Sequence, residues 1–145
     1  MGTAGTRKYS RKRDEILALL RQTPLHPGAR WIYEQLRGKI PGLSLGTVYR
    51  NLTLFCSDGQ AAVLGVINGE ERFDAVAEPH LHVVCTRCGK VADLPVPDKA
   101  ALERFTEVFS QAAHDFEIDY RKTMFCGICE DCASEQRESE SRVAM

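Results

Sequence analysis

Two pairs of cysteines are the most evident candidates for chemistry in this 145-residue chain. Cys85 and Cys88 form one C-x-x-C motif, and Cys129 and Cys132 form a second one after an interval of 40 residues. A C-x-x-C turn brings two thiolates to within about 4 Å of each other, and two such turns can complete a tetrahedral four-sulfur site for Zn²⁺. We therefore expect a structural zinc ion that ties the end of the chain to earlier strands, so that metal binding contributes to folding.

Other interpretations of the cysteines stay open at this point. A thioredoxin-like redox motif would need its C-x-x-C at the start of a helix, whereas Cys88 lies between two apparent strands. Cys126 and Cys129 form a third C-x-x-C register, so the sequence alone does not fix the ligand set. Cys56 lies on a predicted helix, where a buried, unreactive thiol is the simplest interpretation.

A second candidate site consists of histidines and aspartates. His80 and His82 lie two residues apart, which places both imidazoles on the same side of a strand. Asp74 and Asp93 flank this pair. A set of nitrogen and oxygen ligands without sulfur suits Fe²⁺ or Mn²⁺ as well as Zn²⁺, although a chance pair of histidines is the alternative. His26 lies far away in the sequence, and by itself it is better explained as a surface residue or a helix cap.

The elements that must position these residues fall into two groups. The first comprises three short helices and a hairpin with an Asn68-Gly69 turn, a pattern typical of a winged helix-turn-helix whose third helix enters the DNA major groove. The first helix continues a basic N-terminal arm and carries an apolar stripe over residues 14–22. Pro27 lies in the first turn of the second helix. Ser44 is placed to cap the third, which runs to about Cys56. The hairpin strands are expected over Ala62–Ile67 and Glu71–Asp74.

The second group is a small α/β module. Strands are expected over His80–Cys85, Gly89–Leu94 and Glu117–Phe125, with a helix from about Asp98 to His114. Residues from Ser134 onward are rich in Glu, Ser and Arg and are predicted to be disordered. The fold class is therefore α+β, with a winged-helix domain over 1–76, an α/β domain over 77–133 and a disordered tail over 134–145.

Charge separates the two groups as well. Residues 1–60 hold ten Lys/Arg and four Asp/Glu, a net charge of +6, while residues 61–145 hold nine and sixteen, a net charge of −7. A basic front half indicates a polyanionic partner such as DNA. No apolar run approaches the roughly 20 residues that span a bilayer, and the first residues lack a secretory signal. We expect a soluble, cytoplasmic protein without a membrane partner, in a compartment where thiols stay reduced.

Two other classes of protein agree with part of the sequence. A zinc-dependent hydrolase or deaminase could use His80 and His82, but the chain has neither an H-E-x-x-H motif nor an H-x-E motif followed by C-x-x-C. A zinc-ribbon interaction module that does not bind DNA would leave the winged helix without a role. A regulator rather than an enzyme is the favoured interpretation.

The ordered set of motifs resembles the ferric uptake regulator family. The resemblance covers residues 9 to 132 and rests on the following segments: His26-Pro27, Ile32-Tyr33, Pro41, Ser44 to Leu52, Arg72-Phe73-Asp74, His80-x-His82, Cys85-x-x-Cys88-Gly-Lys and Gly127-x-Cys129-x-x-Cys132. It implies a homodimer whose C-terminal domain dimerises and whose structural zinc is held by Cys85, Cys88, Cys129 and Cys132, with Cys126 as a spare thiol. It also implies a regulatory Fe²⁺ or Mn²⁺ at the domain junction, with five ligands: His26, Asp74, His80, His82 and Asp93.

Within that family, the aspartate at position 93 resembles the peroxide-sensing branch, in which a metal-bound histidine becomes oxidised. The resemblance makes His26 and His80 the oxidation targets and implies a repressor that leaves its DNA after oxidation. An iron- or zinc-uptake regulator of the same family is the alternative. The expected partner is palindromic double-stranded operator DNA. We expect Arg50 to reach a base edge or a phosphate and Tyr49 a thymine methyl. The complete set of expected DNA-binding residues is Arg11, Arg13, Ser44, Thr47, Tyr49 and Arg50.

Overall fold

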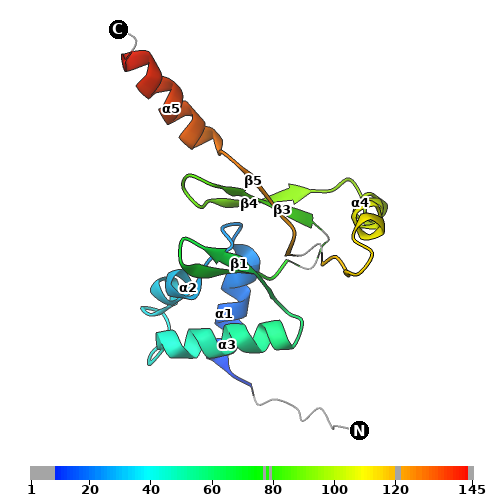
Figure 1. Ribbon diagram of the computed structural model, residues 1–145. Coiled ribbons are helices and arrows are strands. Elements are labelled where there is room, and N and C mark those ends of the chain that lie inside the picture. The colour runs from blue at the N-terminus through cyan, green and yellow to red at the C-terminus, as the bar shows by residue number, and fades with distance from the viewer. Residues whose placement is uncertain (1–8, 77, 79, 120–121, 144–145) are drawn as a thin grey trace.

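Apolar side chains three and four positions apart line one face of each of the first three helices in the computed structural model, which describes residues 9–76, 78, 80–119 and 122–143. The basic residues Arg7 and Lys8 lie outside the described residues. The elements follow one another as α1 (Arg11–Gln22), α2 (Ala29–Leu36), α3 (Leu45–Ser57), β1 (Ala62–Ile67), β2 (Glu70–Asp74), β3 (His80–Cys85), β4 (Val91–Pro95), α4 (Lys99–Ala112), β5 (Met124–Gly127) and α5 (Glu130–Val143). Figure 1 shows α1 to β2 as one module below the sheet formed by β3, β4 and β5.

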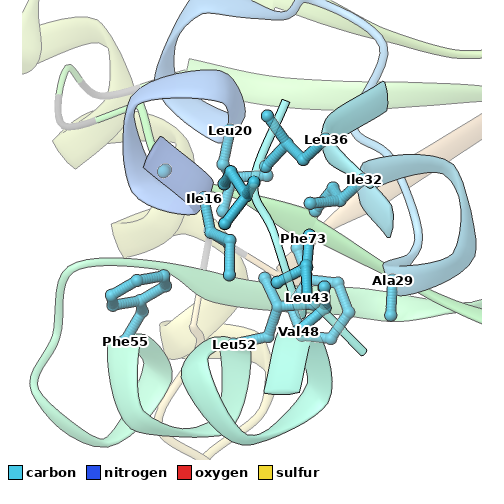
Figure 2. Close-up of a cluster of buried hydrophobic side chains, with 12 residues drawn as sticks. Ile16, Leu20, Ala29, Ile32, Leu36, Leu43, Val48, Leu52, Phe55 and Phe73 are labelled. Carbon is cyan, nitrogen blue, oxygen red and sulfur yellow. The ribbon is translucent and has the colours of Figure 1, made fainter. Parts of the chain in front are cut away.

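The N-terminal module is built around a single apolar core. The three helices and β2 each contribute to a cluster of twelve buried residues, most of which are labelled in Figure 2. Each large apolar side chain that is fully buried contributes about 1.5–3 kcal/mol to stability. Phe73 of β2 is only 3% exposed and packs among the helices. Because Phe73 precedes Asp74, this packing also fixes where the end of β2 lies.

Local signals set the helix starts. The Ser44 hydroxyl accepts a hydrogen bond from the Thr47 amide at 3.1 Å, which confirms the predicted cap of α3. Asp98 caps α4 in the same way, at 2.7 Å from the Ala101 nitrogen. The start of α2 differs from the prediction: the helix begins at Ala29 with Gly28 as its N-cap, so Pro27 precedes the helix instead of lying in its first turn.

The predicted hairpin is present. Strands β1 and β2 pair antiparallel, and their connecting residues Asn68 and Gly69 both have positive φ angles, 53° and 79°. Two such residues form the tight turn that matches the twist of the paired strands. A bulge between Val63 and Gly65 shifts the register of β1. Three helices and this hairpin complete the winged-helix arrangement.

The second module contains a three-stranded sheet in the order β4-β3-β5. Strands β3 and β4 pair antiparallel, and β5 pairs parallel with β3. The strand predicted over Glu117–Phe125 lies later in the chain, at Met124–Gly127. Pairing with β3 determines its position, since Cys85 and Gly127 are register partners where both strands approach the cysteines. Residue alternation alone does not contain this information.

The C-terminal segment differs from its prediction. Residues 134–143 belong to α5 and are not disordered, while residues 144 and 145 lie outside the described part. Polar pairs one to two turns apart support this helix, including Arg137 with Glu130 at 2.7 Å and Gln136 with Glu140 at 3.1 Å. Its first turn is anchored by the buried Cys132. Figure 1 shows α5 projecting away from the sheet.

Candidate functional site

Five side chains from four separate segments meet where the two modules face each other. His26 precedes α2, Asp74 ends β2, His80 and His82 lie on β3, and Asp93 lies on β4. The His26 Nε2 atom lies 2.6 Å from Asp93 Oδ1, and the His80 Nε2 atom lies 3.0 Å from Asp74 Oδ2. The His82 Nε2 atom lies 3.3 Å from Asp74 Oδ2. The structure thus brings together all five residues that the resemblance implied as regulatory-metal ligands.

Strand geometry places three of them. His80 and His82 point to the same face of β3 because side-chain direction repeats every second residue. His82 is the direct register partner of Asp93 on β4. The antiparallel pairing therefore gathers two imidazoles and one carboxylate on one face of the sheet. The N-terminal module supplies the other two groups.

Burial and hydrogen bonds shift the pKa of two members of this cluster, His26 and Asp74. The side chains of His26, Asp74 and His82 are buried, whereas that of Asp93 is 39% exposed. Burial lowers the pKa of His26 below its usual value, against the attraction of the carboxylates of Asp93 and Asp74. Burial alone would favour the neutral acid at Asp74, but hydrogen bonds from His82 and the Val76 amide lower its pKa. A neutral imidazole beside an ionised carboxylate is the form that binds a metal cation.

The hydrogen bonds of the cluster fit a metal between its members. The Glu78 carbonyl accepts a hydrogen bond from His80 Nδ1 at 2.7 Å, which leaves the lone pair of His80 on Nε2. That atom lies 2.9 Å from His82 Nε2, and the buried His82 Nδ1 has no hydrogen-bond partner among the described residues. Two imidazole nitrogens and carboxylate oxygens that converge in this way form a nitrogen and oxygen donor set suited to a divalent cation.

One supporting residue was not predicted to have a role. The Arg72 guanidinium on β2 donates hydrogen bonds to the carbonyls of His26 and Leu25. The sequence gives no signal for this contact, because the acceptors are main-chain atoms distant in the chain. Arg72 also borders a cleft of about 610 Å³ between the modules. The cleft is lined by residues within 24–31 of the N-terminal module, by β2, and by residues 88–93 of the sheet module, including Asp93. The partly exposed Asp93 therefore faces a route from solvent to the cluster.

The four predicted zinc ligands converge at the far end of the sheet. Their four Sγ atoms, from Cys85, Cys88, Cys129 and Cys132, all lie within 4.8 Å of one another. Cys85 ends β3, Cys88 lies in the following turn, and Cys132 lies in the first turn of α5. Cys126 is exposed and is not part of the group, so the geometry selects one register among those that the sequence left open. A compact four-sulfur cluster is consistent with a structural zinc ion.

The thiols of this cluster differ in acidity. Hydrogen bonds from the Cys129 and Cys88 amides lower the pKa of Cys85 to about 6. The neighbouring Cys129 thiol and burial raise the pKa of Cys132 to about 12. The cluster thus readily provides its first thiolate, but it holds a full set of negative charges only with a cation between them.

The helix α3 presents the predicted DNA-binding side chains. Ser44, Arg50 and Tyr49 are exposed, the last by 43%, so Tyr49 is not a core residue. Arg50 donates a hydrogen bond to the Thr47 hydroxyl at 3.1 Å. Ser44 is the N-cap of α3, and Thr47, Tyr49 and Arg50 lie in its first half; the buried residues of the helix are Val48, Leu52 and Phe55. Among the predicted residues of the N-terminal segment, Arg11 is exposed and Arg13 is partly buried.

Among the described residues, none of the helices combines the length and the apolar character that crossing a membrane requires.

Comparison with known proteins identifies the architecture. The model of the ferric uptake regulator family matches residues 4–121. The chain is 34% identical over 127 residues to the peroxide operon regulator of Bacillus subtilis, covering 86% of this chain and 83% of the relative. It is 32% identical over 121 residues to a peroxide-responsive repressor of Staphylococcus aureus, with coverages of 83% and 79%.

Solved structures agree with this result. The Campylobacter jejuni peroxide stress regulator superimposes with a TM-score of 0.69 at 29% identity, covering 83% of this chain and 88% of the other. The Helicobacter pylori ferric uptake regulator has a TM-score of 0.69 at 24% identity, with coverages of 87% and 82%, and shows the shared fold. The chain therefore belongs to the ferric uptake regulator family of metal-dependent transcription regulators and is not an enzyme.

Proposed function

We propose that this protein is a homodimeric repressor that binds palindromic operator DNA when a divalent metal occupies the junction site, and that it releases DNA when hydrogen peroxide oxidises His26 or His80. One observation carries the proposal: the ligand cluster is divided between the modules. His26 and Asp74 belong to the module that carries α3, while His80, His82 and Asp93 belong to the sheet module.

A cation held by both groups would fix the orientation of α3 relative to the second module. Metal binding then raises the fraction of molecules in the orientation that fits DNA. The size of this shift is set by how much more tightly that orientation binds the metal than the other one does. Removing a single ligand weakens this link, because the two modules then share fewer bonds. The switch needs no change within the core of either module.

The peroxide step is supported by the site and by the names of the relatives. Hydrogen peroxide is the two-electron oxidant: one of its oxygen atoms would be inserted into a C–H bond of a nearby imidazole, which is thereby oxidised, and the other would leave as water. Bound Fe²⁺ would supply the redox chemistry that activates peroxide for this reaction. Asp93 borders the open cleft, which gives a small solute access to the cluster. His26 is in direct contact with Asp93, and His80 lies 3.3 Å from the same oxygen. Both imidazoles are therefore close to the side from which peroxide arrives.

The remaining parts of the proposal concern DNA, zinc and the second copy. Family members bind operator DNA as dimers, and we assign the base contacts to Tyr49 and Arg50. We assign Ser44, Thr47, Arg11 and Arg13 to the surrounding DNA surface, chiefly its phosphates. We assign the dimerising surface to apolar side chains of α4 and β5 that are exposed in the single chain, which are Val108, Phe109 and Phe125. A zinc ion held by the four cysteines would tie the end of β3 to the start of α5, and we assign it no part in sensing.

Peptide mass spectrometry tests the oxidation step. The protein is loaded with Fe²⁺, exposed to micromolar peroxide and digested with trypsin. His26 falls in the peptide 22–30, and His80 falls in the peptide 73–87. Neither peptide contains methionine, so an added oxygen atom that fragment spectra place on a histidine cannot come from methionine oxidation. Met124, in the peptide 123–137, reports nonspecific oxidation in the same sample.

The expected result is oxidation of His26 or His80 with Fe²⁺ but not with Mn²⁺. A gel shift with palindromic promoter DNA should show binding that requires the metal and is lost after oxidation. Metal-dependent DNA binding without histidine oxidation would contradict the peroxide step and indicate a regulator of metal supply. DNA binding that ignores the metal would contradict the proposed switch itself.

A further inference from the structure

His26 adopts a backbone conformation that needs support. Its φ angle is 46°, in the left-handed region that residues other than glycine rarely occupy. Such a conformation persists where the surrounding structure fixes it, and it is often found at functional sites. The conformation also determines where the His26 imidazole points.

Strand β2 of the hairpin supports this conformation. Three consecutive carbonyls before α2 accept hydrogen bonds from β2: Leu25 and His26 from the Arg72 guanidinium, and Pro27 from the Phe73 amide at 3.1 Å. The Arg72 Nη2 atom lies 2.9 Å from the Leu25 oxygen. A guanidinium has donors in a rigid plane, so one side chain can hold two adjacent carbonyls at a fixed angle. A lysine ammonium is a single point charge and lacks this planar arrangement.

The same strand carries a ligand. Asp74 follows Arg72 by two residues, and Phe73 between them is buried in the core of the N-terminal module. Strand β2 therefore holds one carboxylate of the cluster and also the loop that bears an imidazole of the cluster. The distance between the His26 and Asp74 side chains, 3.7 Å from Nδ1 to Oδ1, depends on this one strand.

We propose that Arg72 is a positioning residue of the junction site: by holding the carbonyls of Leu25 and His26 it sets the direction of the His26 imidazole and so determines metal affinity. The inference rests on the proposed function, because it assumes that the cluster binds a divalent metal. Groups that orient metal ligands without touching the metal commonly change affinity by about 10- to 100-fold when they are replaced.

A titration with Mn²⁺ tests this role. The full chain, with its cysteine cluster loaded with zinc, is titrated while free Mn²⁺ is followed by electron paramagnetic resonance. Arg72→Gln should raise the Kd by about 10- to 100-fold, and Arg72→Lys should raise it too, because the ammonium cannot hold both carbonyls in one plane. Arg37→Gln is the matched control: it removes the same charge from an exposed residue paired with Glu34, and it should leave the Kd unchanged.

A double-mutant cycle separates positioning from general packing. If Arg72 acts through His26, Arg72→Gln should cause no further loss of Mn²⁺ affinity in a chain that already carries His26→Asn. Hydrogen exchange of the metal-free chain adds a second measurement. Arg72→Gln should accelerate exchange of the Phe73 amide, which bonds the same loop, and leave exchange in the core of α3 unchanged.

The outcomes are distinct. If the natural chain binds no Mn²⁺ at all, the proposed function fails and takes this inference with it. If the natural chain binds Mn²⁺ and Arg72→Gln binds it within about twofold, only the positioning role of Arg72 is overturned. Equal losses with and without the His26→Asn substitution would also overturn it. Should Arg72→Gln not fold, as judged by circular dichroism, the same comparisons are made with Arg72→Lys.

Discussion

Replacement of His26 by asparagine is the most direct test of the junction site. Asparagine tolerates the left-handed backbone of this position better than most residues do, so His26→Asn removes the imidazole with little disturbance of the loop. His26 is 2% exposed, and its nitrogens lie 2.6 Å from Asp93 and 3.7 Å from Asp74. It also joins the N-terminal module to β4. Its loss should therefore abolish most of the stabilisation that the metal provides.

The expected size follows from linkage. A ligand present at 100 times its Kd stabilises the folded state by about 2.7 kcal/mol. For a chain of this length that corresponds to a rise in Tm of roughly 5–10 °C. If losing a direct ligand weakens binding about 100-fold, at the upper end of the effect seen for outer groups, the same Mn²⁺ concentration then equals the Kd. The stabilisation falls to about 0.4 kcal/mol, a rise in Tm of roughly 1 °C.

Differential scanning calorimetry with and without Mn²⁺ measures this difference directly. Comparing each variant with itself cancels any change in metal-free stability. His114→Asn is the matched control, since His114 is the exposed fourth histidine and lies outside the cluster, and it should keep the full rise in Tm. If His26→Asn also kept the full rise, His26 would not be a ligand of the metal. The argument that the metal joins the loop before α2 to the sheet module would then be refuted.

Three further results are expected. Cys129→Ser should lower the zinc content well below one ion per chain, while Cys126→Ser should leave it unchanged, because Cys129 belongs to the cluster and Cys126 does not. Elemental analysis after mild chelation measures the zinc content of both variants. Equal zinc loss in both would contradict the assigned register. In the zinc-loaded chain a thiol reagent should label the exposed Cys126 before Cys56, because burial and Glu71 raise the pKa of Cys56. Faster labelling of Cys56 would show that the end of α3 unfolds locally and exposes this thiol. The metal-free chain should lose stability as pH falls below about 6.5, because the lowered pKa of His26 makes the unfolded state bind more protons than the folded state. Denaturant titrations across this range should show that the free energy of unfolding of His26→Asn depends less on pH than that of the natural chain. An identical pH dependence would contradict the lowered pKa.

Local chemistry made much of the fold predictable. Ser44 accepts the hydrogen bond expected of a helix cap, and Asn68-Gly69 forms the expected turn. Both features depend on residues within a few positions of one another, so the sequence contains their causes. The strand predicted over Glu117–Phe125 lies at Met124–Gly127 in the structure, and residues 134–143, predicted to be disordered, form part of α5. The strand lies where it can pair with β3, and the helix is anchored in its first turn by the buried Cys132.

The candidate site was predictable only in part. From spacing alone, His80 and His82 were expected to share one face of a strand, and four cysteines were expected to bind zinc. His26 entered the ligand set only through the resemblance to a family, because nothing near it in the sequence marks it as a ligand. Its partner atoms lie on Asp74 and Asp93, far along the chain.

The sequence by itself determined which chemical groups are available and where helices and turns begin, since these depend on neighbours in the chain. Tertiary structure alone decided which groups meet. The antiparallel register of β3 and β4 sets His82 opposite Asp93. The burial of Phe73 fixes Asp74, and the Arg72 guanidinium holds two main-chain carbonyls that no sequence pattern reveals. Packing and hydrogen bonding to the backbone act between residues distant in sequence, and for that reason the junction site exists only in the folded chain.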